Sequence, residues 1–347
     1  NDVIISTVRT YQKAVAIIPD ISKLTVASTG FACLRTNEKI SPKFLYYSVL
    51  SDAFVSTVEA YSVGISYPAI NASQLVCLKL PLPSIEEQSQ IANFLDEKCA
   101  VIDRLVERHQ EVIEKLKAYR QSVISEAVTR GLDPDAPMKD SGIAICSTIP
   151  VEWNISRIKY LFKLREERNY QPLDKVKLLS LYTDIGVFPH GEQEERGNKA
   201  VTAEGYKIVY KNDIVVNIIL AWMGAIGISS YDGVTSPAYD IYMPIKNINP
   251  TYFHYLFRTK AFSGECYKYG RGIMAMRWRT YSTEFKSIKV PLPPIEVQND
   301  IVSFLNKKIE DIENIIQKKL TVISKLAEYK KSIIYEYVTG KKEVPAS

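Results

Sequence analysis

Several patterns that mark membrane proteins and secreted proteins are missing from this sequence. No run reaches the roughly 18 apolar residues that a membrane-spanning helix needs. The N-terminal residues lack the basic and then apolar segments of a secretion signal. The five cysteines are an odd number and form no Cys-x-x-Cys pair, which argues against a disulfide framework or a structural zinc site. We therefore expect a cytoplasmic protein that does not contact membranes.

The sequence also lacks a complete catalytic motif. It has no Gly-x-x-x-x-Gly-Lys-Ser/Thr loop for nucleotide phosphates, and its three histidines are too scattered for a metal site. Asn249-Pro-Thr-Tyr252 resembles the Asn-Pro-Pro-Tyr motif of amino-methyltransferases, but the second proline is absent, and Pro250 suits the first position of a helix. Glu284-Phe-Lys286 matches half of a nuclease carboxylate–lysine pattern, and its metal-binding Asp is not evident. These absences favour a binding protein over an enzyme.

The composition is that of an ordinary globular protein. Apolar residues make up 46% and charged residues 24% of 347 residues, a length that suits two domains with a core each. The formal net charge of +5 permits nucleic-acid binding, but many enzymes carry as much charge. Composition alone therefore does not decide the function.

One stretch occurs twice, and the rest of the chain is arranged around it. Residues 81–129 align without a gap with residues 291–339, and 21 of the 49 aligned positions are identical. The first copy begins PLPSIEEQSQIANFL and the second begins PLPPIEVQNDIVSFL. Because solenoid units repeat every ~20–50 residues, a repeat of this longer period indicates a duplicated domain.

Both copies are predicted to form long helices, because neither has an internal proline or glycine and Ser84 is a suitable N-cap for the first. Apolar residues at spacings of three and four predict a coiled-coil seam of Leu95, Ile102, Leu105, Val112, Leu116, Tyr119 and Val123, repeated as Leu305, Ile312, Ile315, Val322, Leu326, Tyr329 and Ile333. A second apolar line is more than two helices need, so it packs either on the globular domains or on helices of a partner. As docking residues for a partner subunit we name Val106, Ile113, Ile124, Ile316, Ile323 and Ile334.

The nine acidic and seven basic residues between Ile85 and Gly131 are intermixed, which is typical of a helix-pairing surface and not of a phosphate-binding stripe.

The segments before the helices are duplicated as well. Asn212-Asp-Ile-Val-Val216 matches Asn1-Asp-Val-Ile-Ile5, and Asn249-Pro250 starts a predicted helix as Ser41-Pro42 does. The second copy has about 70 residues ahead of this strand and the first copy has none. The first domain therefore looks truncated at its N-terminus, or the sequence starts inside it.

The predicted loops at the tips of the two domains differ. In the second domain, Tyr267-Lys-Tyr-Gly-Arg-Gly272 and Arg277-Trp-Arg279 interleave cations, aromatics and glycines, which suits contacts with phosphates and bases. A solvated loop with Trp278 packed in the core is an equal alternative. The matching loop of the first domain, Tyr61–Tyr67, has no basic residue. A shared frame with different tips suggests two half-sites of unlike sequence.

A second pair of tips follows the Asn-Asp strands, namely Arg9-Thr-Tyr11 and Ala221-Trp-Met223. Together the tips provide the candidate DNA-binding residues. These are Arg9, Tyr11, Tyr61, Ser66, Tyr67, Tyr182, Trp222, Met223, Lys268, Tyr269, Arg271, Arg277 and Arg279.

As a set, these motifs resemble the specificity subunit of a type I restriction-modification enzyme, and the resemblance covers essentially the whole chain. It rests on the paired Pro-Leu-Pro-x-Ile-Glu-x-Gln…Ile-x-x-Phe-Leu segments (81–95 and 291–305) and on their Tyr-x-x-Ser-x-Ile-x-Glu-x-Val-Thr endings (119–129 and 329–339). Lys139-Asp-Ser-Gly142, followed by Ile149-Pro150 and Trp153, resembles the start of the family's second recognition domain.

The resemblance implies an α+β fold with two mixed α/β target-recognition domains. Each is followed by a long helix, and the two helices pack as an antiparallel coiled-coil spacer in a pseudo-twofold internal duplication. The corresponding segments are 1–80 (first recognition domain, N-terminally incomplete), 81–131 (first spacer helix), 132–142 (linker), 143–290 (second recognition domain) and 291–342 (second spacer helix).

The resemblance also implies the partners of the chain. They are double-stranded DNA, two modification (methyltransferase) subunits and optional restriction (translocase) subunits. We expect no catalytic residue, metal or cofactor on this chain, because S-adenosylmethionine is bound by the modification subunits. One alternative is a coiled-coil adaptor whose mixed domains bind protein. A self-sufficient methyltransferase or nuclease is disfavoured by the missing motifs.

Overall fold

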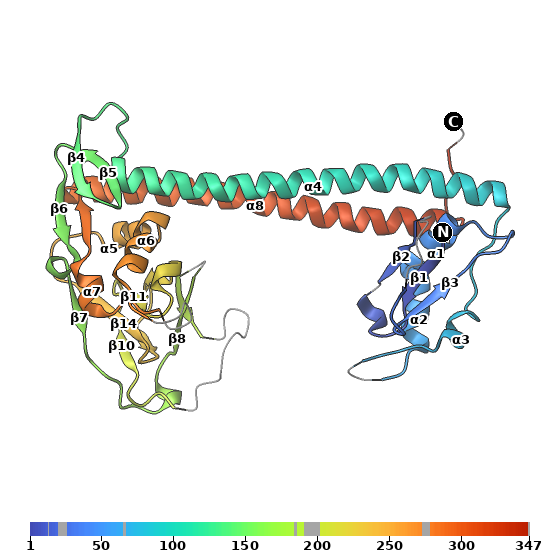
Figure 1. Ribbon diagram of the computed structural model, residues 1–347, viewed down its shortest axis with the longest axis horizontal. Helices are drawn as coiled ribbons and strands as arrows, with labels where there is room; N and C mark the ends of the chain where they lie inside the picture. Colours follow the sequence, from blue (N-terminus) through green and yellow to red (C-terminus); the bar gives the residue numbers. More distant parts are fainter. Residues whose placement is uncertain are drawn as a thin grey trace. The chain divides into compact units, whose positions relative to one another are not determined.

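The computed structural model describes residues 1–12, 14–19, 26–64, 67–183, 186–190, 202–272 and 278–345. The chain divides into two compact units: unit 1 comprises 1–114 and 315–347, and unit 2 comprises 115–314. Each unit contains a globular part and a portion of two long helices, α4 (Ile85–Arg130) and α8 (Ile295–Val338) (Figure 1). Among the described residues, no helix has the length and apolar character needed to cross a membrane.

The globular part of unit 1 is a small antiparallel sheet covered by short helices. Its strands are β1 (Val3–Ser6), β2 (Val15–Ile17) and β3 (Phe31–Leu34), and its helices are η1 (Thr10–Gln12), α1 (Pro42–Leu50), α2 (Asp52–Tyr61) and α3 (Ala72–Leu75). Strand β1 is central, because Val3 is paired with Ile17 on one side and with Leu34 on the other. The alternate residues Val3 and Ile5 are buried against α1 and α2, as expected for a half-buried strand.

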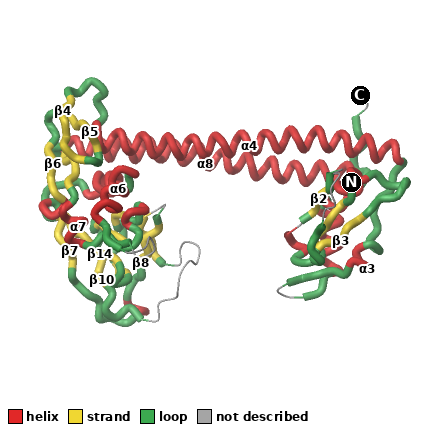
Figure 2. Tube along the Cα trace, viewed as in Figure 1, coloured by secondary structure: helices red, strands yellow, loops and turns green. Residues whose placement is uncertain are grey.

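The globular part of unit 2 is larger than that of unit 1 and combines many short strands with short helices (Figure 2). It is built around a four-stranded antiparallel sheet of order β12-β11-β14-β7. Its strands are β4 (Met138–Ile143), β5 (Cys146–Pro150), β6 (Asn154–Arg157), β7 (Phe162–Arg165), β8 (Leu179–Tyr182), β9 (Gly186–Pro189), β10 (Lys207–Val209), β11 (Ile214–Asn217), β12 (Ile226–Ile228), β13 (Gly233–Thr235), β14 (Tyr239–Pro244) and β15 (Lys289–Leu292). Its helices are η2 (Ile158–Tyr160), η3 (Leu173–Lys175), η4 (Ala221–Met223), α5 (Pro250–Phe257), α6 (Lys260–Tyr269) and α7 (Ser282–Ser287). Phe162, Phe253, Phe257 and Phe285 pack together in its core.

The strand orders confirm that the mixed domains are duplicated. The order β2-β1-β3 in unit 1 corresponds to β12-β11-β14 in unit 2, and β7 adds a fourth strand beside β14. Strand β7 belongs to the segment that precedes the Asn-Asp strand in the second copy, for which the first copy has no counterpart in this sequence. The predicted fold class, two mixed domains each followed by a long helix, is confirmed.

Equivalent glutamines connect the start of each long helix to its domain by hydrogen bonds. Gln88 of α4 accepts a hydrogen bond from Ser41 N at 2.8 Å and donates to the Pro83 carbonyl at 3.0 Å. Gln298 of α8 likewise accepts from Asn249 N and donates to the Pro293 carbonyl, each at 2.8 Å. Both glutamines are buried, so water cannot reach the backbone amide and carbonyl groups that they contact. Each glutamine therefore supplies the hydrogen bonds that these groups need near a helix start.

The two long helices run antiparallel within each unit. In unit 1, Phe94 of α4 contacts Tyr337 of α8, and Lys330 pairs with Asp103 at 2.7 Å. In unit 2, Arg120 of α4 pairs with Glu313 of α8. The Ser84 side chain caps α4 as predicted, since it accepts a hydrogen bond from Glu87 N while the Glu87 carboxylate accepts one from Ser84 N.

The structure corrects the predicted seam. Inward positions of α4 in unit 1 are Leu95, Cys99, Ile102, Val106, His109 and Ile113, all buried or half-buried. Leu105, by contrast, is 41% exposed. The seam was misassigned where two apolar residues are adjacent in sequence, as in Leu105-Val106 and Ile315-Ile316. Neighbouring side chains point about 100° apart on a helix, and in these pairs the second member faces inward.

Candidate nucleic-acid interface

The two predicted tips of the second domain meet in unit 2. The short helix η4 carries Trp222 and Met223, and it packs against α6. The rings of Trp222 and Tyr267 lie edge to face with centroids 5.8 Å apart, and Tyr267 stacks on Trp278 at 5.0 Å. We call Trp222, Tyr267 and Trp278 the aromatic tip. Tyr267 and Met223 are each more than half exposed, so the tip offers apolar surface on which a base could stack.

Two glycines allow this close packing. Gly224 ends η4 with a φ of 85°, a left-handed conformation that favours glycine. Gly270 has an ordinary φ, but a Cβ placed there would lie 2.3 Å from Nε1 of Trp278. The same Nε1 donates a hydrogen bond to the Tyr267 carbonyl at 3.0 Å, which fixes the Trp278 ring. Trp278 thus packs on the tip itself, a placement between the two predicted alternatives.

Two arginines flank the aromatic tip. Arg271 and Arg279 exchange backbone hydrogen bonds of 2.9 and 3.0 Å. The Arg271 side chain is 75% exposed, and its guanidinium pairs with the Glu284 carboxylate at 2.7 Å. A hydrogen bond from the Thr283 hydroxyl, together with the nearby Arg271 charge, lowers the pKa of Glu284. Glu284 is therefore ionised at neutral pH and holds a solvent-facing cation beside the aromatic rings.

The prediction that Lys268 and Tyr269 lie in a loop is wrong, because α6 continues to Tyr269 before Gly270 ends it. Lys268 extends toward Glu265, with Nζ 3.8 Å from the carboxylate. Tyr269 is half-buried against the core, which suits packing better than base stacking. Arg277, a further predicted contact, lies outside the described residues.

The first domain brings its two tips together in the same way. Arg9, whose φ is 51°, places its guanidinium 4.8 Å from the centre of the Tyr67 ring. The hydroxyls of Thr10 in η1 and Ser62 after α2 are 3.1 Å apart, so η1 meets the end of α2 as η4 meets α6. Tyr11, Tyr61 and Tyr67 are all exposed, and Ser66 lies outside the described residues. The tips share a position but differ in side chains.

The remaining predicted contact, Tyr182, is the last residue of β8 and is paired with Gly186 of β9. It is half-buried, and no ring contact joins it to the aromatic tip in the part of the chain that the structure describes.

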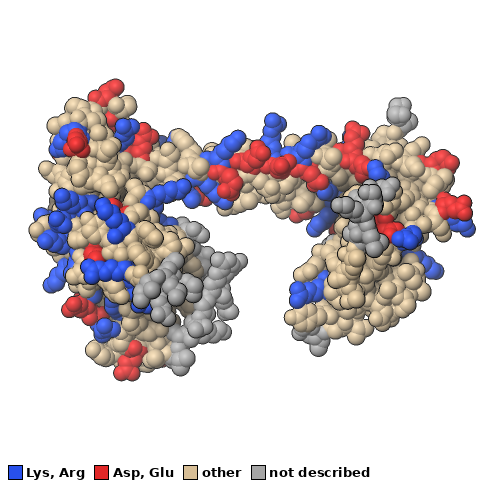
Figure 3. Space-filling model, in the orientation of Figure 1, with Lys and Arg blue, Asp and Glu red and all other residues tan. Residues whose placement is uncertain are grey.

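Charge also distinguishes the two units. Figure 3 shows Lys and Arg side chains spread over the globular part of unit 2, whereas the same view of the globular part of unit 1 is mostly uncharged.

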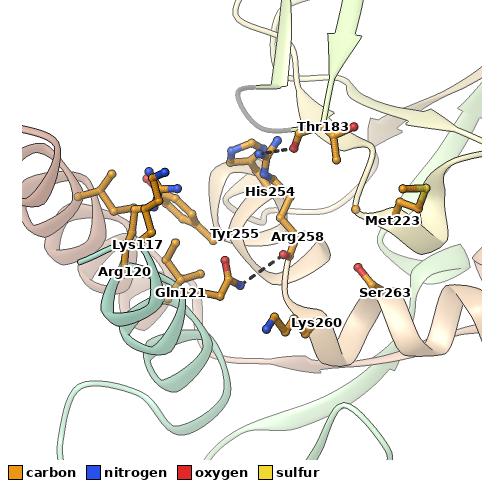
Figure 4. Close-up of a pocket in the computed structure, with 13 residues that line it drawn as sticks. Lys117, Arg120, Gln121, Thr183, Met223, His254, Tyr255, Arg258, Lys260 and Ser263 are labelled. Carbon is orange, nitrogen blue, oxygen red and sulfur yellow. Dashed lines mark hydrogen bonds between the residues drawn. The ribbon is translucent and has the colours of Figure 1, made fainter. Parts of the chain in front are cut away.

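A basic cavity in unit 2 was not predicted from the sequence. Its cations are Lys117 and Arg120 of α4 together with Arg258 and Lys260 at the junction of α5 and α6 (Figure 4). The two pairs are more than 130 positions apart in sequence, so they form no local motif. The folding of α4 back onto its following domain brings them together, and spacing patterns carry no signal of that.

The burial of the six residues predicted to dock a partner subunit argues against that role for three of them and leaves it a prediction for Val106, Ile124 and Ile323. Ile113, Ile316 and Ile334 are buried within this chain, and Val106, Ile124 and Ile323 are half-buried. Val106 and Ile334 belong to the core that α4 and α8 share in unit 1. The exposed members of the adjacent pairs are Leu105 and Ile315. In α8, Val322 and Tyr329 continue the exposed line of Ile315 at intervals of one heptad.

No group of three or more His, Cys, Asp or Glu side chains among the described residues could hold a metal ion. Burial raises the pKa of the Cys146 thiol to about 11 and raises that of Cys266 further. Both thiols are therefore protonated at neutral pH and are poor nucleophiles. The described chemistry of unit 2 is that of a binding surface with aromatic rings and fixed cations.

Comparisons with known proteins identify relatives of the chain. A family model described as type I restriction modification DNA specificity domain matches residues 1–116 and 150–338. The chain is 26% identical over 280 residues to the type I restriction enzyme EcoBI specificity subunit of Escherichia coli, a match that covers 76% of this chain and 58% of that protein. It is 22% identical over 310 residues to the MjaVIII specificity subunit of Methanocaldococcus jannaschii, covering 84% and 68% of the two chains.

A solved structure described as the basis of complex assembly and conformational transition of the type I restriction-modification system contains a similar fold. The TM-score is 0.74 at 18% identity, and the match covers 98% of this chain and 82% of that chain. The chain therefore spans well under two thirds of the Escherichia coli relative and most of this structural neighbour.

Proposed function

Because the chain belongs to the family of the type I restriction modification DNA specificity domain, we propose that it is the DNA-recognition subunit of a type I restriction-modification complex. The observation that carries the proposal is the duplicated frame with unlike tips. In unit 1 the tip has Arg9 over Tyr67, and in unit 2 it has the aromatic tip with Arg271. Segments 1–80 and 143–290 would each read one half of a bipartite DNA sequence, since equal frames with different side chains select different bases.

The partners follow from this role. The chain is without catalytic activity of its own and scaffolds two modification subunits, which bind S-adenosylmethionine and methylate adenine in the bound DNA. Restriction subunits join the complex in systems that also cleave DNA. The complex acts in the cytoplasm, where its DNA substrate lies.

The long helices would hold the modification subunits through an outer apolar line, which consists of Leu105 and Val112 of α4 and Ile315, Val322 and Tyr329 of α8. Four of these five side chains are exposed, and Val112 is half-buried. Apolar side chains at heptad spacing on an exposed helix face suit packing by a further helix.

The direct test is to co-express the chain with its modification subunits and to map methylated bases by single-molecule sequencing. We expect one bipartite motif with two unlike halves. Exchange of segment 143–290 for that of a relative should change one half and leave the other. Methylation without any bipartite motif would contradict the proposal.

The alternative is a coiled-coil adaptor whose mixed domains bind protein, favoured only by the intermixed charge of the helices. Salt dependence separates the two functions. A DNA reader that contacts several phosphates loses binding affinity by orders of magnitude between about 50 and 200 mM salt. An adaptor would show no such DNA binding at any salt concentration.

A further inference from the structure

The basic cavity has a charge composition that sets it apart from an ordinary surface depression. It has a volume of ≈ 640 Å³ and lies where α4, α5, α6 and η4 meet in unit 2. Its thirteen lining residues include four cations, Lys117, Arg120, Arg258 and Lys260, and no aspartate or glutamate (Figure 4). Glu313 of α8 balances the charge of Arg120, and the other lysine and arginine side chains of the lining favour an anion at this opening.

The protein orients two of these cations. Arg258 donates from Nη2 to the Thr183 carbonyl at 2.8 Å and from Nη1 to the Ile226 carbonyl at 3.4 Å. These two carbonyl partners orient the guanidinium. Arg120 forms an ion pair with Glu313 on α8, which anchors it at the wall formed by the long helices. Lys260, the first residue of α6, is exposed at the cavity.

The positive charge of the cavity does not depend on its histidine. Burial, and then the nearby Arg258 charge, lower the pKa of His254 to about 3. Its Nδ1 accepts a hydrogen bond from Ile228 N at 3.2 Å, which also requires an unprotonated nitrogen. The other cations that line the cavity are lysine and arginine side chains.

The cavity adjoins the residues that are proposed to meet bases. Met223 and Gly224 line it, and Trp222 of the aromatic tip precedes them in η4. A duplex whose bases reach the aromatic tip would therefore bring its sugar–phosphate backbone to the cavity. Phosphate contacts fix the register of a protein on DNA and leave sequence choice to the base contacts.

We propose that the basic cavity binds phosphate groups of the DNA backbone and so positions the recognition tip of unit 2. The inference rests on the proposed DNA-recognition function and names a contact site for it outside the tip loops. A free nucleoside phosphate offers the same chemistry, and the experiment below separates the two sources.

Two variants and one control test the cavity. Lys260→Ala removes an exposed cation, and Ser263→Asp adds a carboxylate on the wall, where the serine Oγ lies 3.6 Å from the Cβ position of Gly224. Ser263 is in the first turn of α6, where an acidic side chain is compatible with the helix, so this variant should fold. Lys307→Ala is the matched control, because Lys307 is an exposed lysine of α8 two positions from the lining residue Ile309 and points to another side of the helix.

Binding of the full chain to two duplexes of unrelated sequence is measured by fluorescence anisotropy from about 50 to 200 mM salt. For Lys260→Ala we expect the slope of log affinity against log salt to fall by about 1, equally for both duplexes, as for one lost phosphate contact. Ser263→Asp should weaken binding to both duplexes, and Lys307→Ala should match the wild type.

Three outcomes would overturn the inference. If the wild type binds DNA and both cavity variants keep its slope, the cavity does not bind phosphates, while the proposed function stands. If the wild type binds neither duplex at low salt, the proposed function fails and the inference fails with it. If calorimetry shows tight ATP binding that Lys260→Ala abolishes without changing the DNA slope, the cavity belongs to a free nucleotide.

Discussion

Arg271 combines an exposed side chain with a fixed position, which is what a base contact requires. The Glu284 carboxylate lies 2.7 Å from its guanidinium, and the backbone of Arg271 is bridged to that of Arg279. We predict that Arg271→Ala weakens DNA binding by about 1–3 kcal/mol and relaxes the methylated motif at one base of one half-site. The measurement is affinity by anisotropy together with the methylation motif of the assembled complex.

Glu284→Gln is the control, because it keeps the Arg271 charge but removes the ion pair that orients it. Its affinity should stay near that of the wild type while its motif relaxes. Unchanged affinity and an unchanged motif in Arg271→Ala would remove Arg271 from the interface. For Arg277→Ala the same loss is expected from the sequence, and Arg277 lies outside the described residues.

His254 makes the stability of the fold depend on pH. Its pKa falls from 6.5 to about 3 on folding, so between these values the unfolded chain binds a proton that the folded chain does not. Stability is therefore full above about pH 6.5 and declines as the pH falls toward 3. From pH 7.5 to 5.5 the loss should be at most about 1 kcal/mol, because part of the ring surface remains at the cavity.

The variant His254→Asn tests this dependence, since an amide oxygen can replace Nδ1 as the acceptor for Ile228 N without titrating. Urea unfolding at the two pH values should show a smaller difference in the variant than in the wild type. His190→Asn, which replaces an exposed imidazole, should show the wild-type difference. An equal pH dependence in His254→Asn and the wild type would contradict the assignment.

At the scale of elements, each long helix is joined to its domain by one glutamine side chain. Gln298 is buried, and its removal leaves Asn249 N and the Pro293 carbonyl without their partner. We predict that Gln298→Ala lowers the free energy of unfolding by about 1–3 kcal/mol, and that Gln88→Ala does the same in unit 1. Urea unfolding followed by circular dichroism measures this loss. The exposed Gln317 of α8 is the control, and Gln317→Ala should change stability by no more than about 0.5 kcal/mol.

Local signals in the sequence were sufficient for the two long helices, the two Asn-Asp strands and the helices that begin at Pro42 and Pro250, because those signals act over a few residues. Pro42 and Pro250 start helices as predicted, with Ser41 and Asn249 at the N-cap positions, and the duplicated strand order follows from the duplicated sequence. The coiled-coil seam was only half predictable. Where two apolar residues are adjacent, as in Ile315-Ile316, periodicity cannot decide which of them faces the other helix.

The candidate site, like the fold, was predictable only where the sequence signal is local. Tip segments could be predicted because aromatic and basic residues cluster within a few positions, and the structure brings Trp222 and Tyr267 together. The extent of α6 could not, because no strong stop signal precedes Gly270 and the helix runs through Lys268 and Tyr269. The basic cavity depends on tertiary contacts between α4 and α5, about which sequence spacing is silent.

For the assembled molecule, the two faces of the long helices should have separable roles. Ile315 is 42% exposed on the outer apolar line, whereas the next residue, Ile316, is 5% exposed between the helices. We predict that Ile315→Ser combined with Val322→Ser lowers the unfolding free energy of the isolated chain by about 1–2 kcal/mol in total, because the two side chains are already 42% and 38% exposed. The same variant should no longer co-purify with the modification subunits.

Ile316→Ser is the matched control, with the same chemical change one position along α8. It should destabilise the isolated chain by about 2–4 kcal/mol, because it removes a buried side chain and leaves a hydroxyl in its place. Size-exclusion chromatography of the co-expressed subunits reads out assembly, and urea unfolding of the chain reads out stability. If Ile315→Ser with Val322→Ser assembles normally, the modification subunits dock elsewhere. If both variants fail in stability alike, the two faces are not separable, and the exposure of Ile315 has no role in assembly.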